Sequence, residues 1–174
     1  EQFRTSVPTI SAIGDVIGRI QLAHAAEAQG IAAVEYMQGL EQASVNYELV
    51  PSCVYTTPEI ASVGATADEA KKAGRGVITG KYIMNGNAKS IIEQQERGFM
   101  KVVFDKETDV LLGAQLMCAR ATDLISELVT AVSLGLTREQ LARTMRPHPT
   151  LCEGITEAVE GAGGHSIHTM PSRR

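Results

Sequence analysis

The segment Arg146-Pro-His-Pro-Thr-Leu-Cys-Glu153 carries the densest group of side chains that could do chemistry. In it His148 stands between two prolines, and the carboxylate of Glu153 follows five residues later. Proline on each side restricts the backbone, so the imidazole has little freedom to change direction. Glu153 could hold one ring nitrogen while the other nitrogen exchanges a proton with a substrate, which is general acid–base chemistry.

The same residues also have a purely structural interpretation. Thr150 and Glu153 have the types and spacing of a capping box, in which a hydroxyl and a carboxylate satisfy free amide groups at the start of a helix. Glu153 would then cap a helix, and His148 would lie in a turn. On the local pattern alone, this structural interpretation is favoured over the catalytic one.

The composition is that of an ordinary soluble globular protein. The 174 residues are 44% apolar and 21% charged, which is enough for one core and an appendage. A net charge of −4, without any long cluster of basic residues, disfavours nucleic acid or an anionic membrane as partner. No apolar run reaches the ~18 residues of a membrane span, and the N-terminal residues lack the pattern of a secretory signal.

The three cysteines give no sign of a metal or dithiol site. Cys53, Cys118 and Cys152 form neither a CxxC pair nor a cluster with histidines. We therefore expect no metal site, and reduced thiols favour a cytoplasmic location.

Residues 1–46 are expected to form a first part of the chain. A short apolar piece at 7–13 leads into Gly14-Asp15, and an alanine-rich helix follows from about residue 20. Gly30 is expected to interrupt this helix and Gly39 to end it. Its small side chains predict close packing against a neighbouring element.

Residues 47–160 are expected to form a second, independently folded domain. Strands are predicted near 50–55 and at 77–82, 99–104 and 110–117, with 105–109 joining the last two as a hairpin. Capping boxes at 66–69 and 137–140 each start a helix, and a further helix ends at Gly135. This order predicts an α+β fold, an antiparallel sheet with helices packed on one side. Residues 161–174, which include His165 and His168, are expected to be a flexible tail, ordered only if something holds it.

The motif His-Pro-Thr-Leu-x-Glu, after a helix that ends Leu-Ala-Arg-Thr, resembles a motif of the pyridine nucleotide–disulfide oxidoreductases, specifically of their dihydrolipoamide dehydrogenase branch. The resemblance covers nearly the whole chain. Residues 7–16 resemble the second flavin-binding segment of the family, 22–24 and their continuation resemble the helix that faces the flavin ring, and 50–64 resemble the entry into the interface domain. It implies that 1–46 are the last part of a flavin-binding domain and 47–160 a dimerisation domain.

The resemblance also implies roles for individual residues. His148 and Glu153 would be the acid–base pair, reaching across a homodimer interface to serve the flavin and disulfide of the partner subunit. A dihydrolipoyl thiol would lose its proton to the histidine, and electrons would pass through a redox disulfide and FAD to NAD⁺. Asp15 would bind the ribityl chain of FAD, and the amides of Leu22 and Ala23 would lie by the flavin pyrimidine edge. Without the resemblance, Gly14-Asp15 indicates only a turn.

The family's redox disulfide and nucleotide-binding domains do not occur in these 174 residues. We therefore expect a fragment that supplies the homodimer interface and the acid–base pair, is inactive alone and binds neither FAD nor NAD by itself. The expected partner is a lipoyl-bearing protein of a 2-oxoacid dehydrogenase or glycine cleavage complex. A glutathione- or mercuric-type reductase and a non-catalytic dimerisation module are the alternatives. Arg146 stands where the lipoamide branch often has another histidine, and Cys152 where a serine is usual.

Overall fold

The computed structural model describes residues 3–40, 44–95 and 97–169, and the chain divides into two compact units. The boundary lies between Val50 and Pro51, four residues beyond the limit expected from the sequence. Each unit has its own internal contacts, and each is described by itself. Within the described residues, no helix is both long and apolar enough to cross a membrane.

The first unit is organised around helix α1 (Ala23–Met37). Gly30 does not interrupt this helix, contrary to expectation; it packs closely against Ile13, and a Cβ at that position would lie 3.2 Å from Ile13 Cδ1. Gln29 is fully buried, and its Oε1 accepts a hydrogen bond of 2.7 Å from the Gly14 amide. Its Nε2 donates to the Tyr47 hydroxyl at 3.3 Å. One amide side chain thus joins three segments of this unit.

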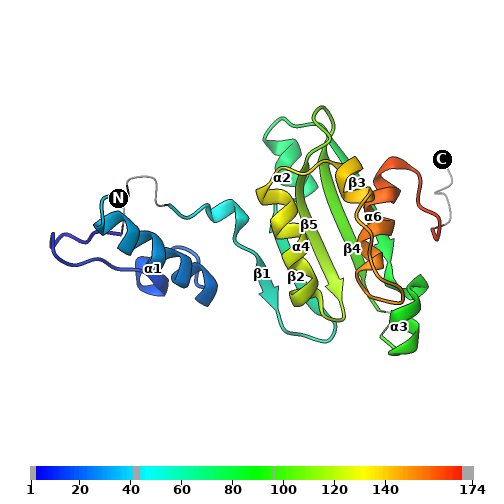
Figure 1. Ribbon diagram of the computed structural model, residues 1–174, viewed down its shortest axis with the longest axis horizontal. Coiled ribbons are helices and arrows are strands. Elements are labelled where there is room, and N and C mark those ends of the chain that lie inside the picture. Colours follow the sequence, from blue (N-terminus) through cyan, green and yellow to red (C-terminus); the bar gives the residue numbers. More distant parts are fainter. Residues whose placement is uncertain (1–2, 41–43, 96, 170–174) are drawn as a thin grey trace. The chain divides into compact units, whose positions relative to one another are not determined.

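Among the described residues, the second unit contains a five-stranded antiparallel sheet of order β1-β2-β5-β4-β3 (Figure 1). Its strands are β1 (Ser52–Val54), β2 (Glu59–Gly64), β3 (Val77–Ile83), β4 (Phe99–Asp105) and β5 (Leu111–Cys118). The predicted strands at 77–82, 99–104 and 110–117 and the hairpin at 105–109 are confirmed. Strand β2 was not predicted from the sequence.

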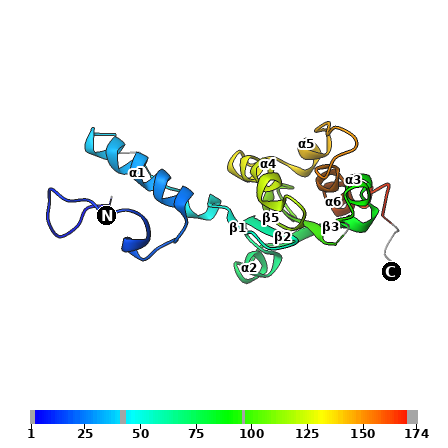
Figure 2. The same cartoon turned by 90° about the horizontal axis from the view of Figure 1, so that it is seen from below.

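The longer helices cover one face of the sheet. The helices of this unit are α2 (Ala67–Lys72), α3 (Ala88–Ile92), α4 (Ala121–Ser133), α5 (Arg138–Ala142) and α6 (Glu153–Gly163). α4 packs on β2 and β5, and α6 packs on β3 and β4. Figure 2 shows α4, α5 and α6 on the same side, with the short α2 on the other. The predicted α+β class is confirmed, as are the capping boxes that start α2 and α5.

Two glycines allow α6 to lie very close to the sheet. A Cβ on Gly80 of β3 would lie 1.8 Å from the carbonyl oxygen of Ala158, and a Cβ on Gly154 would lie 2.9 Å from the sulfurs of Met84 and Met100. A side chain on Gly80 would force α6 to move, whereas one on Gly154 would displace the buried side chains of Met84 and Met100. The first residue of α6 is Glu153, so this close contact also fixes the position of that carboxylate.

We expect Gly80→Ala to lower the free energy of unfolding by about 3 kcal/mol, because the added methyl group forces α6 away from the sheet. Gly161→Ala, on the same helix, is the control: its Cβ would lie 3.9 Å from its nearest neighbour, Ser166 Cβ. It should be neutral, or stabilising by up to ~1 kcal/mol. Urea denaturation of both variants gives the comparison. Equal stabilities for the two variants would contradict this role of Gly80 in packing.

Candidate active site

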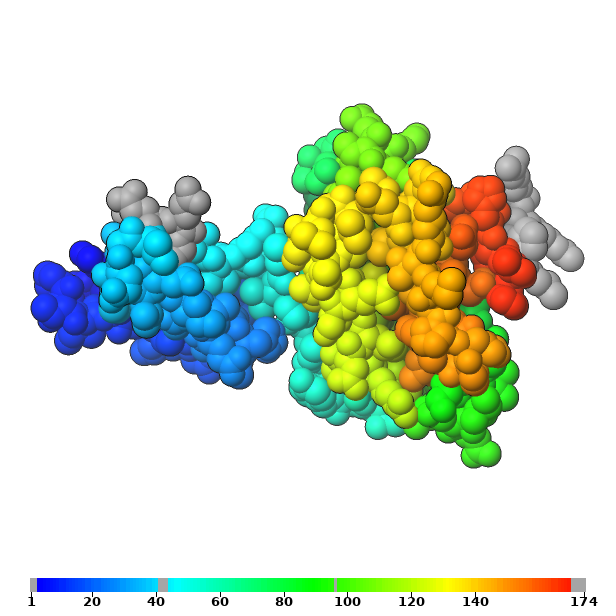
Figure 3. Space-filling model, in the orientation of Figure 1, coloured from blue at the N-terminus to red at the C-terminus, as the bar shows by residue number. Residues whose placement is uncertain are grey.

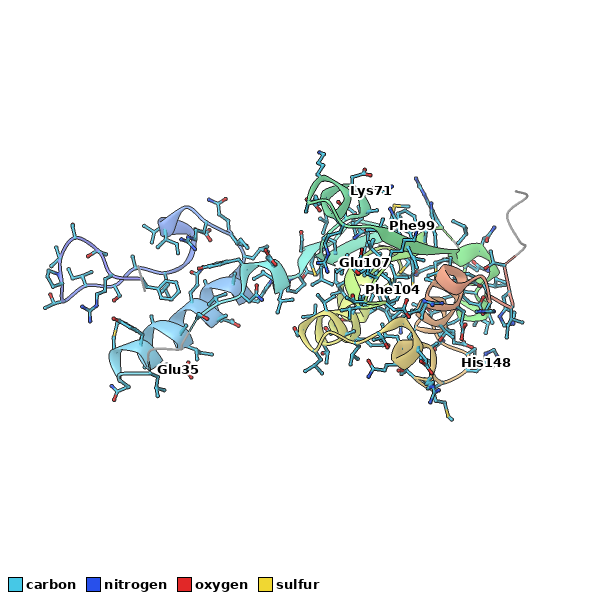
Figure 4. All side chains as sticks on the ribbon, turned by 90° about the horizontal axis from the view of Figure 1, so that it is seen from above. Glu35, Lys71, Phe99, Phe104, Glu107 and His148 are labelled. Carbon is cyan, nitrogen blue, oxygen red and sulfur yellow. The ribbon has the colours of Figure 1, made fainter. Side chains whose placement is uncertain are left out.

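His148 and Glu153 form a hydrogen-bonded pair at the surface of the second unit. Nδ1 of His148 lies 2.9 Å from Oε1 of Glu153. The histidine side chain is 71% exposed, whereas the glutamate is 28% exposed. Figure 4 shows His148 at the outside of the domain and Phe104 within its core. The ring is therefore held on one side by the carboxylate and open to solvent on the other.

The second oxygen of Glu153 caps the chain segment that leads into α6. Oε2 accepts a hydrogen bond of 2.8 Å from the Thr150 amide, as in the second half of a capping box. The Thr150 hydroxyl does not complete the box, because it donates to the carbonyl of Pro147 at 2.6 Å. The geometry is thus compatible with both interpretations: Oε2 acts in capping, and Oε1 binds the histidine.

The Glu153 carboxylate is held in its ionised form. Partial burial alone would raise its pKa, but the Thr150 amide and the His148 ring, both hydrogen-bonded to it, outweigh burial and bring the pKa below its ordinary value. An ionised carboxylate on Nδ1 favours the tautomer with the proton on that nitrogen. Nε2 then carries a lone pair that can accept a proton.

The loop that carries His148 is anchored from a third element. The Asn87 side chain is buried, and its Nδ2 donates to the carbonyl of Thr150 at 3.0 Å. Its Oδ1 accepts from the Ser90 amide and so caps α3. Sequence reasoning missed Asn87, although an asparagine directly before a helical stretch is a recognised N-cap signal.

Arg146 anchors the same loop to two helices. Its side chain is 3% exposed, its Nη2 pairs with Glu127 of α4, and its Nη1 donates to the Thr156 hydroxyl of α6 at 2.8 Å. It also donates to the carbonyls of Leu141 and Thr144. In the sequence Arg146 was only a departure from the family pattern. In the structure it fixes the backbone two residues before the dyad.

The dyad lines a cavity of about 360 Å³ between β3, α6 and the segment after α6. Its other walls include Tyr82, Glu157, Ile167 and His168. Tyr82 is almost completely buried, and this burial raises its pKa. The negative charges of Glu157 and Glu153 raise the pKa of Tyr82 further, by a smaller amount. This volume accommodates the end of a small or extended ligand.

Residues 164–169, which follow α6, are held on the helix, whereas residues 170–174 of the expected flexible tail lie outside the described residues. α6 continues to Gly163, beyond the domain limit expected at 160. The Ser166 hydroxyl and the His168 amide both donate to Oε2 of Glu157, at 2.5 and 3.1 Å. Nδ1 of His168 lies 2.8 Å from Oε1 of the same carboxylate. Figure 3 shows the orange segment that contains His148 and the red segment after α6 on one face of the domain.

The residues expected to bind flavin belong to the first unit. Asp15 is exposed in the turn Gly14–Ile17, and Leu22 and Ala23 form the start of α1, which has no side-chain cap. An exposed carboxylate can accept hydrogen bonds from sugar hydroxyls, and free helix amides can donate to flavin carbonyls. The chemistry of these three residues is thus compatible with the flavin-binding roles that the family resemblance implies.

Within the described residues, no three His, Cys, Asp or Glu side chains gather into a metal-binding cluster. Cys152 is half-buried, and its sulfur lies 2.9 Å from the Thr150 hydroxyl.

Residues 50–159 match the family model described as pyridine nucleotide-disulphide oxidoreductase, dimerisation domain. The chain is 44% identical over 168 residues to a dihydrolipoyl dehydrogenase of Bacillus subtilis and 41% identical over 169 residues to one of Halobacterium salinarum. Each alignment covers 97% of this chain but 35% of the relative, so the chain spans about a third of these relatives' length.

Solved structures share the fold. LpdA from Mycobacterium tuberculosis superposes with a TM-score of 0.84 at 30% identity, over 91% of this chain and 35% of that protein. The HOCl-induced flavoprotein disulfide reductase RclA from Escherichia coli superposes with a TM-score of 0.84 at 23% identity, over 91% of this chain and 37% of the RclA chain. At this identity the similarity concerns the fold alone.

We expect Glu153→Gln to reduce the dependence of stability on pH in acid. Because the folded-state pKa of Glu153 is lowered, its ionised form stabilises the protein above the unfolded-state value of about 4.5, and this contribution is lost as the pH falls through the folded-state value. At pH 7 the variant should be less stable by about 1 kcal/mol. The difference should shrink below pH 4.5 in chemical denaturation series. A difference that stays constant from about pH 7 to about pH 3 would contradict this assignment.

Proposed function

This chain belongs to the pyridine nucleotide-disulphide oxidoreductase family, and we propose that it is the carboxy-terminal part of a dihydrolipoyl dehydrogenase. The whole enzyme would oxidise dihydrolipoyl groups and pass the electrons through a redox disulfide and FAD to NAD⁺. The observation that carries the proposal is the His148–Glu153 pair, with one ring nitrogen held by a carboxylate and the other open to solvent at a cavity. The 44% identity over nearly the full chain supports it.

In this proposal His148 is the base that activates the substrate thiol. The thiol proton would move to Nε2, and the resulting thiolate would attack one sulfur of the redox disulfide. The disulfide bond would break, a mixed disulfide would form and the other cysteine would leave as a thiolate. Glu153 stabilises the imidazolium through Nδ1 and keeps the ring in one orientation. Arg146 and Asn87 hold the loop, so the ring does not need to be ordered again in each turnover.

The first unit would contribute to the FAD site. Asp15 would accept hydrogen bonds from the ribityl chain, and the amides of Leu22 and Ala23 would donate to the pyrimidine edge. FAD, when bound, supplies the two-electron carrier between the disulfide and NAD⁺. We propose that the 174 residues alone bind neither FAD nor NAD, because these three residues provide only a small part of a dinucleotide site.

We propose a homodimer in which the dyad of one subunit serves the active site of the other. The family description of residues 50–159 as a dimerisation domain supports this, and so does the exposed apolar surface beside the dyad. Met145, which precedes Arg146 in the dyad loop, is 95% exposed, and Ile167, which lines the cavity, is 84% exposed. The substrate would be a lipoyl group on a protein of a 2-oxoacid dehydrogenase or glycine cleavage complex.

A reducing, cytoplasmic-type compartment is part of the proposal. Cys53, Cys118 and Cys152 are free thiols in the described structure. Burial, with a smaller contribution from Glu59, raises the pKa of Cys118 to about 12, so this cysteine stays a protonated and unreactive thiol.

We expect His148→Gln in the complete protein to slow oxidation of dihydrolipoamide by ~10²–10⁴-fold, because the thiol loses its base. Reduction of an artificial acceptor by NADH, which needs no thiol deprotonation, should change less than about twofold. Steady-state assays of both reactions on one preparation separate the two steps. Equal losses in both would mean that His148 is not the base for the thiol.

We expect the chain to self-associate, because interfaces of obligate dimers bury ~2,000–5,000 Å² of surface and leave apolar patches exposed on isolated subunits. Sedimentation over a concentration series should show a dimer, and Met145→Asp should weaken it by at least ~10-fold in Kd. A purely monomeric chain at high concentration would argue against a homodimer formed by these residues.

A further inference from the structure

A second histidine–carboxylate pair lines the same cavity as the dyad and repeats its geometry. Nδ1 of His168 lies 2.8 Å from Oε1 of Glu157, as Nδ1 of His148 lies 2.9 Å from Oε1 of Glu153. The two glutamates stand four residues apart on α6, which places them ~6 Å apart along one side of the helix. One histidine precedes the helix and the other follows it.

The two pairs also have the same pattern of burial. The rings of His148 and His168 are 71% and 69% exposed, whereas the carboxylates of Glu153 and Glu157 behind them are 28% and 11% exposed. Among the residues that the structure describes, neither ring has a hydrogen-bond partner on Nε2. Each pair therefore presents an open nitrogen in front of a shielded carboxylate.

Attachment of the C-terminal segment does not require the imidazole of His168. Glu157 already accepts hydrogen bonds from the Ser166 hydroxyl and from the backbone amide of His168. A residue with any side chain at position 168 could donate that amide, proline excepted. The ring adds a titratable group to the wall of a cavity that Tyr82 of β3 and the dyad also line.

We propose that His168, held by Glu157, is a second proton acceptor for the dithiol substrate. The inference rests on the proposed function, because a dithiol gives up two protons and two electrons when its sulfurs join. The first thiol loses its proton to Nε2 of His148, and its thiolate forms a mixed disulfide with the redox disulfide, which releases one cysteine as a thiolate. The second thiol loses its proton to Nε2 of His168. Its thiolate then closes the substrate disulfide and releases the other cysteine as a thiolate, and the redox disulfide has received both electrons.

The charges around the cavity allow both rings to accept protons. Burial alone would raise the pKa of Glu157, but hydrogen bonds from Ser166 and His168 outweigh it, and the pKa lies below its ordinary value. His168 interacts with the carboxylates of Glu157 and Glu153 on α6. The other titratable or charged groups that line the cavity are the phenol of Tyr82, the ring of His148 and the guanidinium of Arg146. Two ionised carboxylates thus accompany two imidazoles, so two imidazolium ions can form without excess positive charge.

The test uses His168→Gln in the complete protein, with Ser166→Ala as the matched control that loosens the same segment but keeps the ring. The readouts are kcat and KM for dihydrolipoamide and the slope of log kcat/KM against pH on the acid side. We expect a slope of two in the wild type and in Ser166→Ala, and a slope of one in His168→Gln. In His168→Gln, kcat should fall at least ~10-fold with little change in KM. Added imidazole should restore part of the rate to His168→Ala.

The outcomes separate this inference from the proposed function. A wild-type protein that does not oxidise dihydrolipoamide would overturn both. An active wild type whose His168→Gln variant keeps the rate and the slope would overturn only the role of His168. That role would also be overturned if Ser166→Ala and His168→Gln lose activity equally and imidazole restores none, since His168 would then only attach the segment.

Discussion

The site depends on one carboxylate, that of Glu153, whose two oxygens bind different partners. Oε1 of Glu153 binds His148, and Oε2 binds the Thr150 amide at the turn before α6. Both hydrogen bonds favour the ionised carboxylate, so the group that stabilises the helix start also holds the imidazole in one tautomer. Fixing the helix thereby fixes the direction of the ring.

The rest of the second unit keeps that carboxylate in place. Gly80 and Gly154 let α6 approach the sheet so closely that an added Cβ at either position would collide with a neighbouring atom. Arg146 and Asn87 then attach the preceding loop to α4, α6 and α3. An exposed histidine would otherwise sample many orientations, and this frame, built from buried groups, removes most of that freedom.

Local sequence patterns predicted the structural features that depend on residues close together in the chain. They did not predict the features that depend on tertiary contacts. The capping boxes at 66–69 and 137–140 and the hairpin at 105–109 follow from short-range chemistry and were predicted. Gly30 was expected to break α1 because propensity says nothing of the Ile13 side chain packed against it. The His168–Glu157 contact joins residues that only folding brings together, although the spacing of Glu153 and Glu157 by one helical turn was visible in the sequence.

The most direct test of the central claim is the protonation pattern of the His148 ring, read from its ¹⁵N chemical shifts by NMR at neutral pH. The geometry predicts a proton on Nδ1, shared with Glu153, and a bare Nε2; Glu153→Leu should shift the population toward the other tautomer. A wild-type ring that carries its proton on Nε2, with Nδ1 bare, would contradict the claim that Glu153 prepares His148 to accept a proton.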